Sequence, residues 1–289
     1  MTPRPLIRII DSLRTVEGGG FVVRRPFPTN VVDHIDPFLL LDEMGPADYA
    51  PGKAVGAPSH PHRGFETVTY LLEGAMVHED TTGACAVIRP GGVQWMTAGS
   101  GVIHSELPTE DLVRLGGRLH GFQLWVNLPA ANKMKDPRYQ GYDADEITTV
   151  PLANGGSMKV VAGEVHGARG PVETTSPMTY AHAVLQAGDV IEWNPPASHT
   201  ALIHVFEGDV HVNDNVAVSG NMAVFERSAG SVRVVAGKDG AQVLVLGGEP
   251  LNEPVARYGP FVMNTREELV TAVQEYNDGT LVKVGKAVL

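Results

Sequence analysis

The sequence contains one cysteine, Cys85, only 6% aromatic residues and no long apolar run. A single thiol forms no intrachain disulfide, so the fold must be held by packing or by a metal ion. No stretch approaches the roughly 18 apolar residues that a membrane span needs, and the first residues are too charged for a signal peptide. These absences predict a cytoplasmic protein without a membrane anchor.

Basic charge is also scarce. The 289 residues carry 22 Lys and Arg against 33 Asp and Glu, a formal net charge of −11. Such an excess of negative charge repels phosphate backbones and argues against direct nucleic-acid binding. A hydrophobic fraction of 43% is sufficient for a sizeable core, and the length is typical of two domains.

Glycine and proline are abundant, with 33 and 21 copies, and they separate short apolar segments. Short strands at this spacing favour an all-β fold of antiparallel barrels or sandwiches over alternating β-α units. The segments expected to form strands are Val68–Leu72, Ala86–Ile88, Phe122–Leu128, Lys159–Val161, Ala181–Leu185, Leu202–Phe206, Val232–Val235 and Val243–Leu246.

One helix is expected near the C-terminus. Thr265 and Glu268 have the spacing of a capping box, in which Thr265 is the N-cap. The following residues keep apolar positions through Tyr276, and Asn277-Asp278-Gly279 is typical of a helix end.

The chain also shows signs of an internal duplication. Residues 70–74 and 204–208 each end an apolar strand in Glu-Gly, and a second strand follows, which predicts a tight hairpin in each half. We therefore expect an N-terminal domain over residues 1–132, a polar linker over 133–146, and a C-terminal domain over 147–289 that includes the helix.

Two pairs of polar residues have the spacing of one strand face. With a period of two, His60, His62 and Glu66 share a face with the apolar residues that follow them, and His104 shares one with Glu106. Side chains at i and i+2 have Cα atoms about 6.6 Å apart. Their imidazoles can therefore reach one ion with bonds of about 2.1 Å.

A buried structural role is the competing interpretation for any single histidine. It is the one we adopt for the histidines without such a pairing, namely His34, His78, His120, His166, His182, His199, His204 and His211. Four inward polar groups left without an ion would each cost about 1–3 kcal/mol unless they were paired, which favours a metal. Nitrogen and oxygen ligands suit Fe, Mn, Ni, Co or Zn, and Cys85 is expected to be a small buried residue.

Several longer sequence motifs resemble those of known protein families. The spacing HxHxxxE before a Glu-Gly turn resembles the first motif of the cupin superfamily. The strings HPHRGFETVTYLLEG, GGVQWMTAGSGVIHSE, DPFLLLDE and GGEPLNEPVARYGPFVMNT resemble the pirin family of two-cupin proteins over nearly the whole chain. In general cupins a histidine follows the second motif, but here Pro90–Gln94 precedes Trp95. The resemblance implies an all-β bicupin of two jelly-roll barrels.

The resemblance also implies a ligand set and a chemistry. The ligands are His60, His62, His104 and Glu106 of the N-terminal domain, whereas Glu66 lies behind them and orients an imidazole or coordinates weakly. The implied ion is divalent, Fe(II) first, with Mn, Ni, Co or Zn as alternatives. The C-terminal domain lacks a corresponding set and is expected to be a degenerate cupin.

Pirins are associated with quercetin 2,3-dioxygenase activity, so the expected substrates are a flavonol or a related enol and O2. In that reaction Glu106 accepts the 3-hydroxyl proton, and ring opening releases carbon monoxide. Candidate pocket residues are Phe65, Trp95, Met96, Phe122 and Trp125, although aromatic side chains at such positions more often fill the interior of a barrel. The alternative is a non-enzymatic, metal- or redox-sensing protein that binds a transcription factor or a metabolic enzyme. We expect a monomer in either case.

Overall fold

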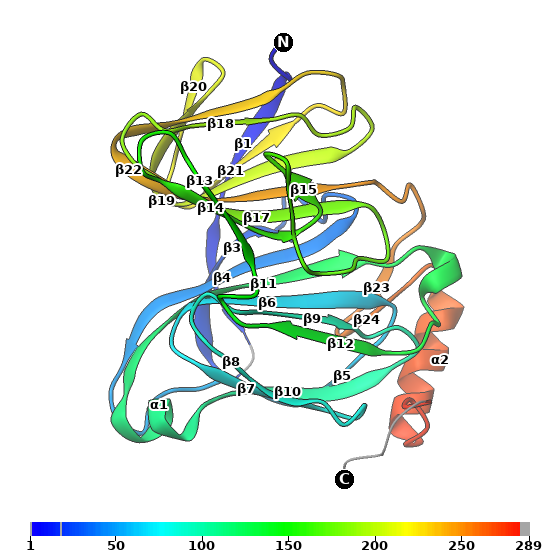
Figure 1. The fold of residues 1–289 in the computed structure, drawn as a ribbon. Coiled ribbons are helices and arrows are strands. Elements are labelled where there is room, and N and C mark those ends of the chain that lie inside the picture. Colours follow the sequence, from blue (N-terminus) through cyan, green and yellow to red (C-terminus); the bar gives the residue numbers. More distant parts are fainter. Residues whose placement is uncertain (1, 18, 284–289) are drawn as a thin grey trace. The chain divides into compact units, whose positions relative to one another are not determined.

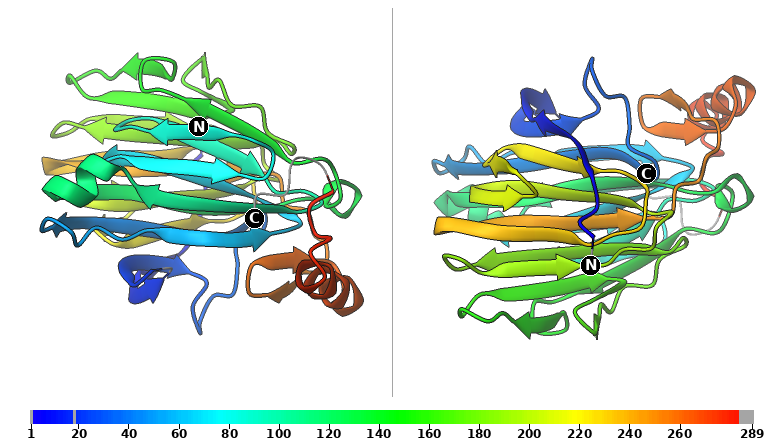
Figure 2. Two further views of the ribbon diagram at one scale, coloured as in Figure 1. Left: turned by 90° about the horizontal axis from the view of Figure 1, so that it is seen from below. Right: turned by 90° about the horizontal axis from the view of Figure 1, so that it is seen from above.

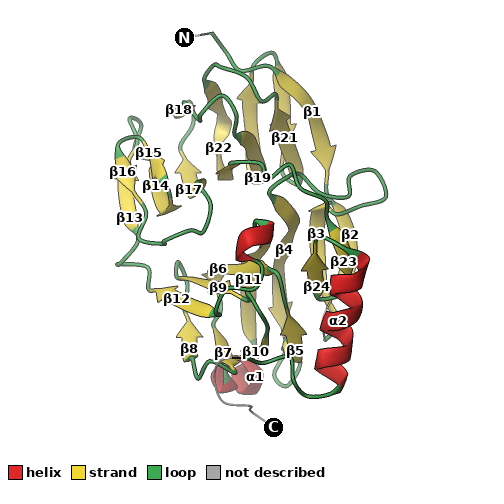
Figure 3. Ribbon diagram, turned by 90° about the vertical axis from the view of Figure 1, so that its right-hand side faces the viewer, coloured by secondary structure: helices red, strands yellow, loops and turns green. Residues whose placement is uncertain are grey.

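The computed structural model describes residues 2–17 and 19–283, and strands dominate both halves of the chain (Figures 1 and 3). Contacts divide the chain into two compact units. Unit 1 comprises the residues up to Leu13, Arg25–Pro37 and Asp145–Pro250. Unit 2 comprises Arg14–Arg24, Phe38–Ala144 and the residues from Leu251 onward. None of the described helices is long and apolar enough to cross a membrane.

Unit 2 contains two antiparallel sheets. The larger runs in the order β12-β9-β6-β11-β4-β3-β2 and the smaller in the order β5-β10-β7-β8. The strands are β2 (Leu13–Glu17), β3 (Phe21–Phe27), β4 (Phe38–Tyr49), β5 (Ala57–His62), β6 (Phe65–Glu73), β7 (Met76–Asp80), β8 (Cys85–Ile88), β9 (Val93–Thr97), β10 (Val102–Pro108), β11 (Gly117–Asn127) and β12 (Arg138–Tyr142).

The inner faces of these two sheets pack against each other. Along β10 burial alternates, with Val102, His104 and Glu106 buried. Across the interior, Glu106 accepts a hydrogen bond from Thr69 of β6. In β6, by contrast, every residue from Phe65 to Leu71 is buried, so both faces of this strand are covered. Unit 2 is thus a sandwich whose interior carries polar side chains from both sheets.

Helical segments complete unit 2. They are α1 (Glu110–Leu115), a 3-10 turn η1 (Ala130–Asn132) and α2 (Arg266–Asn277), which follows the hairpin of β23 (Ala256–Tyr258) and β24 (Phe261–Met263). Helices α1 and α2 lie at opposite ends of the strands (Figure 2). The predicted capping box of α2 is confirmed, since Thr265 and Glu268 exchange side chain–backbone hydrogen bonds. Its buried Leu269 and Ala272 pack against Phe261 and Met263.

Unit 1 contains one large antiparallel sheet, in the order β1-β21-β19-β22-β17-β14-β13, with β18 paired to β22 and β20 to β19. A small hairpin joins β15 to β16. The strands are β1 (Leu6–Asp11), β13 (Thr148–Pro151), β14 (Ser157–Ala162), β15 (Glu164–Val165), β16 (Ala168–Arg169), β17 (Met178–Leu185), β18 (Val190–Trp193), β19 (Thr200–Val212), β20 (Asn215–Val218), β21 (Asn221–Phe225) and β22 (Val232–Gly248).

The antiparallel all-β architecture is confirmed, although the sheets do not close into barrels. The two predicted Glu-Gly hairpins are wrong. After Gly74 the chain leaves the sheet of β6 and enters the smaller sheet as β7, and at Gly208 strand β19 continues. Both glycines have positive φ, +79° and +70°, and the pairing of β19 with β22 shifts register just after Gly208. The segments 232–235 and 243–246 also belong to one strand, β22.

The domain boundaries differ from the expected ones for two reasons. Strand β1 pairs with β21, so the N-terminal residues belong to the sheet formed mainly by the second half. Helix α2 and the hairpin before it pack with the first half, where Arg63 forms a β-bridge with Phe261. The expected linker over 133–146 contains β12, which pairs with β9 as an edge strand of the larger sheet in unit 2.

Candidate metal centre

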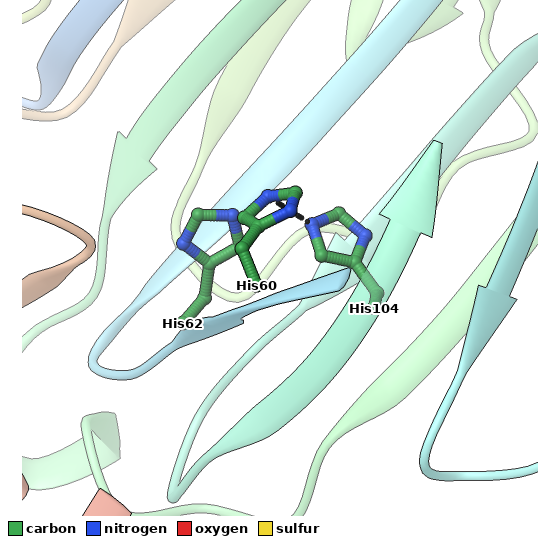
Figure 4. A group of neighbouring side chains, drawn as sticks. All are labelled: His60, His62 and His104. Carbon is green, nitrogen blue, oxygen red and sulfur yellow. Dashed lines mark hydrogen bonds between the residues drawn. The ribbon is translucent and has the colours of Figure 1, made fainter. Parts of the chain in front are cut away.

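Three imidazoles converge in unit 2. His60 and His62 project from β5 and His104 from the neighbouring β10 (Figure 4). One ring nitrogen of each lies within 4.8 Å of one ring nitrogen of the other two. The Nε2 atoms of His60 and His104 are 3.0 Å apart.

The strand register produces this convergence. His104 stands opposite His60, and Val102 stands opposite His62, so all three histidines share the inward face of two paired strands. Burial then differs among the rings, because His62 and His104 are only 3% and 2% exposed whereas His60 is partly exposed. Access to the cluster is therefore from the side of His60.

The outward nitrogen of each ring is engaged. The Nδ1–H of His60 donates to the carbonyl of Pro58 at 2.7 Å, and that of His62 to the carbonyl of Pro260 at 3.4 Å. The Nδ1 of His104 lies 3.4 Å from Nδ1 of His78. With every Nδ1 engaged, Nε2 is the nitrogen of each ring that remains for an ion.

Protonation agrees with this role. Burial, together with the neighbouring imidazoles, lowers the pKa of His62 and His104 well below the usual value of 6.5. Both rings are therefore neutral at physiological pH, the form that binds a metal. The donor set fits a divalent transition ion.

Glu106 is on the same inward face as His104 but outside the imidazole cluster. Its Oε1 accepts hydrogen bonds from the Thr69 hydroxyl, at 2.6 Å, and from the Gln94 amide. The pairing of β10 with β5 is irregular between His104 and Glu106. Glu106 therefore stands opposite Ala57 of β5, three residues before His60. Among the described residues, its Oε2 has no hydrogen-bond partner.

Glu66 does not lie with the imidazoles. The predicted continuous strand is interrupted at Arg63-Gly64, and β6 beyond it belongs to the other sheet. There Glu66 shares a face with Trp95 and Thr97, which donate hydrogen bonds to its carboxylate at 3.0 and 2.8 Å. The opposite face of β6 carries Thr69.

Of the predicted pocket residues, Phe65 and Trp125 lie beside the cluster. Their rings are 5.0 and 5.3 Å from His62, in both cases edge to face. Trp95 and Phe122 are fully buried and stand opposite Val68 and Tyr70, on the face of the sheet that carries Glu66. Cys85 is free and exposed, not buried as expected.

Two groups beside the cluster were not predicted from the sequence. His78 and Asp80 of β7 stand opposite Glu106 and His104 and are buried with them. They have the same i, i+2 spacing as the pairs that were recognised, and that spacing could have revealed them. Gln94 was also missed, because nothing in its local pattern indicates that it contacts Glu106.

The fold and the cluster together define a two-unit cupin protein with a histidine-rich site in one unit. The family model "Pirin" matches residues 20–126, and "Pirin C-terminal cupin domain" matches residues 180–282. The chain therefore belongs to the pirin family, as its motifs indicated, and the predicted bicupin fold is confirmed.

Three known proteins illustrate the similarity. A Caulobacter vibrioides "Pirin-like protein" is 44% identical, over 96% of this chain and 99% of its own. The structure of "Quercetin 2,3-dioxygenase" from Acinetobacter baumannii matches with a TM-score of 0.91 and 37% identity, over 97% and 99% of the two chains. The Escherichia coli pirin YhhW, in complex with nickel(II), shares the fold at a TM-score of 0.65 and 20% identity, over 84% and 99%.

Proposed function

We propose that this chain is a mononuclear metal-dependent dioxygenase that opens the heterocyclic ring of a flavonol such as quercetin. The observation that carries the proposal is the convergence of His60, His62 and His104 through neutral, outwardly anchored imidazoles. The related A. baumannii protein, which bears the name of this activity, supports it.

In this proposal the three histidines and Glu106 hold the ion, which we take to be Fe(II). The bound ion supplies Lewis acidity toward the flavonol oxygens and redox chemistry toward dioxygen. Mn, Ni, Co and Zn accept the same nitrogen and oxygen donors.

Glu106 acts on the proton of the substrate. Thr69 and Gln94 hold Oε1, so Oε2 is the atom that would both ligate the ion and accept the proton of the 3-hydroxyl group, and its bond to the ion would have to loosen as it takes the proton. These two donors fix the orientation of the carboxylate before the substrate arrives. The reaction consumes one O2 and releases one carbon monoxide.

Phe65 and Trp125 form the apolar part of the proposed site. Their rings lie 4.4 Å apart beside His62, and Arg257 lies 4.9 Å above the ring of Trp125. Such a wall suits the flat rings of a flavonol and restricts water near the reacting atoms.

The test is oxygen uptake and carbon monoxide release from quercetin by protein loaded anaerobically with Fe(II). We expect turnover in the wild type and none in His62→Ala. Glu106→Gln is expected to keep bound metal and to lose about 10²–10⁴-fold in rate, the range for removal of a general base. Unchanged turnover in Glu106→Gln would contradict its role. A wild type with stoichiometric iron and no turnover would favour the sensing, partner-binding alternative.

A further inference from the structure

We propose that His78 and Asp80 form a positioning relay that fixes the tautomer and the orientation of His104 as a metal ligand. This inference rests on the metal centre proposed above. It adds two residues that bind neither the ion nor the substrate and that act only through His104.

Both residues are built into the wall of the site. Strand β7 pairs with β10 on the side away from β5, with Asp80 opposite His104 and His78 opposite Glu106. His78 is fully buried and Asp80 is 5% exposed. The inward face of the smaller sheet therefore carries the ligands on two strands and the relay on the third.

The hydrogen bonds run in one direction. Asp80 Oδ2 lies 2.9 Å from Nε2 of His78 and, as a carboxylate, accepts its N–H. With that proton on Nε2, Nδ1 of His78 presents a lone pair, which faces Nδ1 of His104 at 3.4 Å and accepts that N–H. The remaining nitrogen of His104, Nε2, keeps its lone pair on the side of His60.

Asp80 is itself held in place. Its Oδ1 accepts hydrogen bonds from the Thr82 amide and hydroxyl at 2.7 and 2.6 Å and from the Ala84 amide at 3.2 Å. This leaves Oδ2 for His78. The Tyr139 ring stacks on His78 with centroids 4.7 Å apart, so the imidazole is fixed in its plane as well as at its nitrogens.

The need for two residues follows from the chemistry of the acceptor. His60 and His62 donate to backbone carbonyls, which only accept and so fix the tautomer unaided. An imidazole either donates or accepts at Nδ1, depending on its tautomer. His78 serves as an acceptor for His104 only because Asp80 holds the proton of His78 on Nε2.

The first experiment measures the affinity of the metal-free protein for nickel(II) by competition with a chelator. Partners of this kind contribute about 10–100-fold to metal affinity, so we expect losses of that size in His78→Ala and Asp80→Asn. The Asp80→Asn side chain offers an amide N–H to His78, which favours the opposite tautomer. Glu79→Gln, an exposed neighbour on the same strand, is the control and should bind like the wild type.

The second experiment separates positioning from general destabilisation. In the cobalt(II)-loaded protein the Nδ1–H protons of the three ligand rings give exchangeable, paramagnetically shifted proton resonances. We expect His78→Ala and Asp80→Asn to shift the His104 resonance or broaden it by solvent exchange, and to leave the other two unchanged. His78→Gln keeps an amide oxygen as acceptor and should restore most of the nickel affinity lost in His78→Ala.

The outcomes distinguish the two proposals. If His104→Ala abolishes nickel binding while His78→Ala and Asp80→Asn stay within twofold of the wild type, the relay is wrong and the metal centre stands. If His104→Ala itself keeps the wild-type affinity, both fail. If His78→Ala does not fold, as judged by urea unfolding of the metal-free protein, His78→Gln and Asp80→Asn with their resonances decide the question.

Discussion

At the scale of single residues, the site depends on the glycine that follows its first two ligands. Gly64 has a φ of +88°, and a Cβ placed there would lie 1.9 Å from the carbonyl oxygen of Val262. The same backbone receives the buried Lys133 ammonium, which donates to the carbonyls of Gly64 and Val262 at 2.8 and 3.1 Å. Only glycine allows this approach, two residues from His62.

Gly64→Ala is therefore expected to lower both stability and metal affinity. A non-glycine residue at positive φ costs about 1–3 kcal/mol, and displacement of the Val262 backbone adds to this. Gly83→Ala is the matched control, because Gly83 has a φ of +94° but no atom within 4 Å of the added Cβ. Urea unfolding and nickel titration of both variants measure the difference. Equal losses of stability and nickel affinity in the two variants would show that the contact between Gly64 and the Val262 carbonyl is not the cause.

The sequence predicts which side chains share one face of a strand wherever polar residues alternate with a period of two. His60 with His62, and His104 with Glu106, each share an inward face as expected. The assignment of Glu66 failed because the period was carried through Arg63-Gly64, where the chain changes sheet. Lys133, expected in a polar linker, is 1% exposed, since its ammonium donates to the nearby Asn127 side chain and to two backbone carbonyls from distant parts of the chain.

At the scale of elements, α2 and the residues after it hold the turn between β5 and β6. The guanidinium of Arg63 donates to the carbonyl of Ser100 at 2.6 Å, to Glu275 of α2 at 2.5 Å and to the carbonyl of Leu281 at 3.3 Å. Lys283 also lies 2.9 Å from Glu275. Helix α2 thus anchors, through Glu275, the turn that directly follows the ligands His60 and His62.

The Glu275 contacts make part of the stability depend on pH. Burial alone raises the pKa of this carboxyl, but hydrogen bonds and charges from Arg63 and Lys283 outweigh it, and the pKa lies below the usual 4.5. A lowered folded-state pKa stabilises the fold above the unfolded pKa, and this contribution is lost as the pH falls through the folded value.

Glu275→Gln should therefore destabilise the protein at neutral pH, by about 1 kcal/mol for a partly exposed pair. The difference from the wild type should shrink once the pH is below the usual carboxyl range. Urea midpoints at several pH values measure it, with Glu267→Gln, an exposed carboxylate of the same helix, as control. A difference that stays constant or grows toward acid pH would contradict the assignment.

The elements that local patterns define were predictable, and those that depend on sheet assembly were not. The ends of α2 follow from its capping box and from the residues after Tyr276. The merger of two predicted strands into β22 was not visible, because Gly237 and Gly240 are typical of a turn and here lie inside one long strand. Strand β22 pairs with β19 on both sides of these glycines, through Val234–Ala236 and Ala241–Gly248, and residues 237–240 lie between the two paired stretches.

At the scale of the whole molecule, the two units have interiors of different chemistry. Inside unit 2, the imidazoles and Glu106 meet Thr69 and Gln94. Inside unit 1, the corresponding side chains are aliphatic, such as Ile203, Val243 and Val245, and they form one apolar cluster. His182 and His204 stand opposite Leu244, on the other face of that sheet from this cluster.

The duplication was visible in the sequence, but the limits of the units were not. Repeated Glu-Gly segments indicated two similar halves, and family matches over 20–126 and 180–282 agree with two domains. Pairing of β1 with β21, and packing of α2 against the first half, are long-range contacts that no local pattern encodes. Composition and periodicity report local structure, whereas these boundaries depend on which distant segments complete each sheet.

The contrast between the two interiors leads to the last prediction, a single metal ion per chain. Within residues 2–17 and 19–283, the group of three His, Cys, Asp or Glu side chains whose ligand atoms meet is His60, His62 and His104. An aliphatic interior offers a divalent ion neither donors nor compensation for its lost hydration, so unit 1 should bind none.

Metal analysis after loading with nickel(II) and removal of loosely bound ions should give one equivalent for the wild type and none for His104→Ala. His211→Ala, which removes an exposed histidine of β19, should keep one equivalent. Two equivalents in the wild type, or one equivalent remaining in His104→Ala, would place a site in the other unit. Either result would show that the difference between the two interiors does not determine where the ion binds.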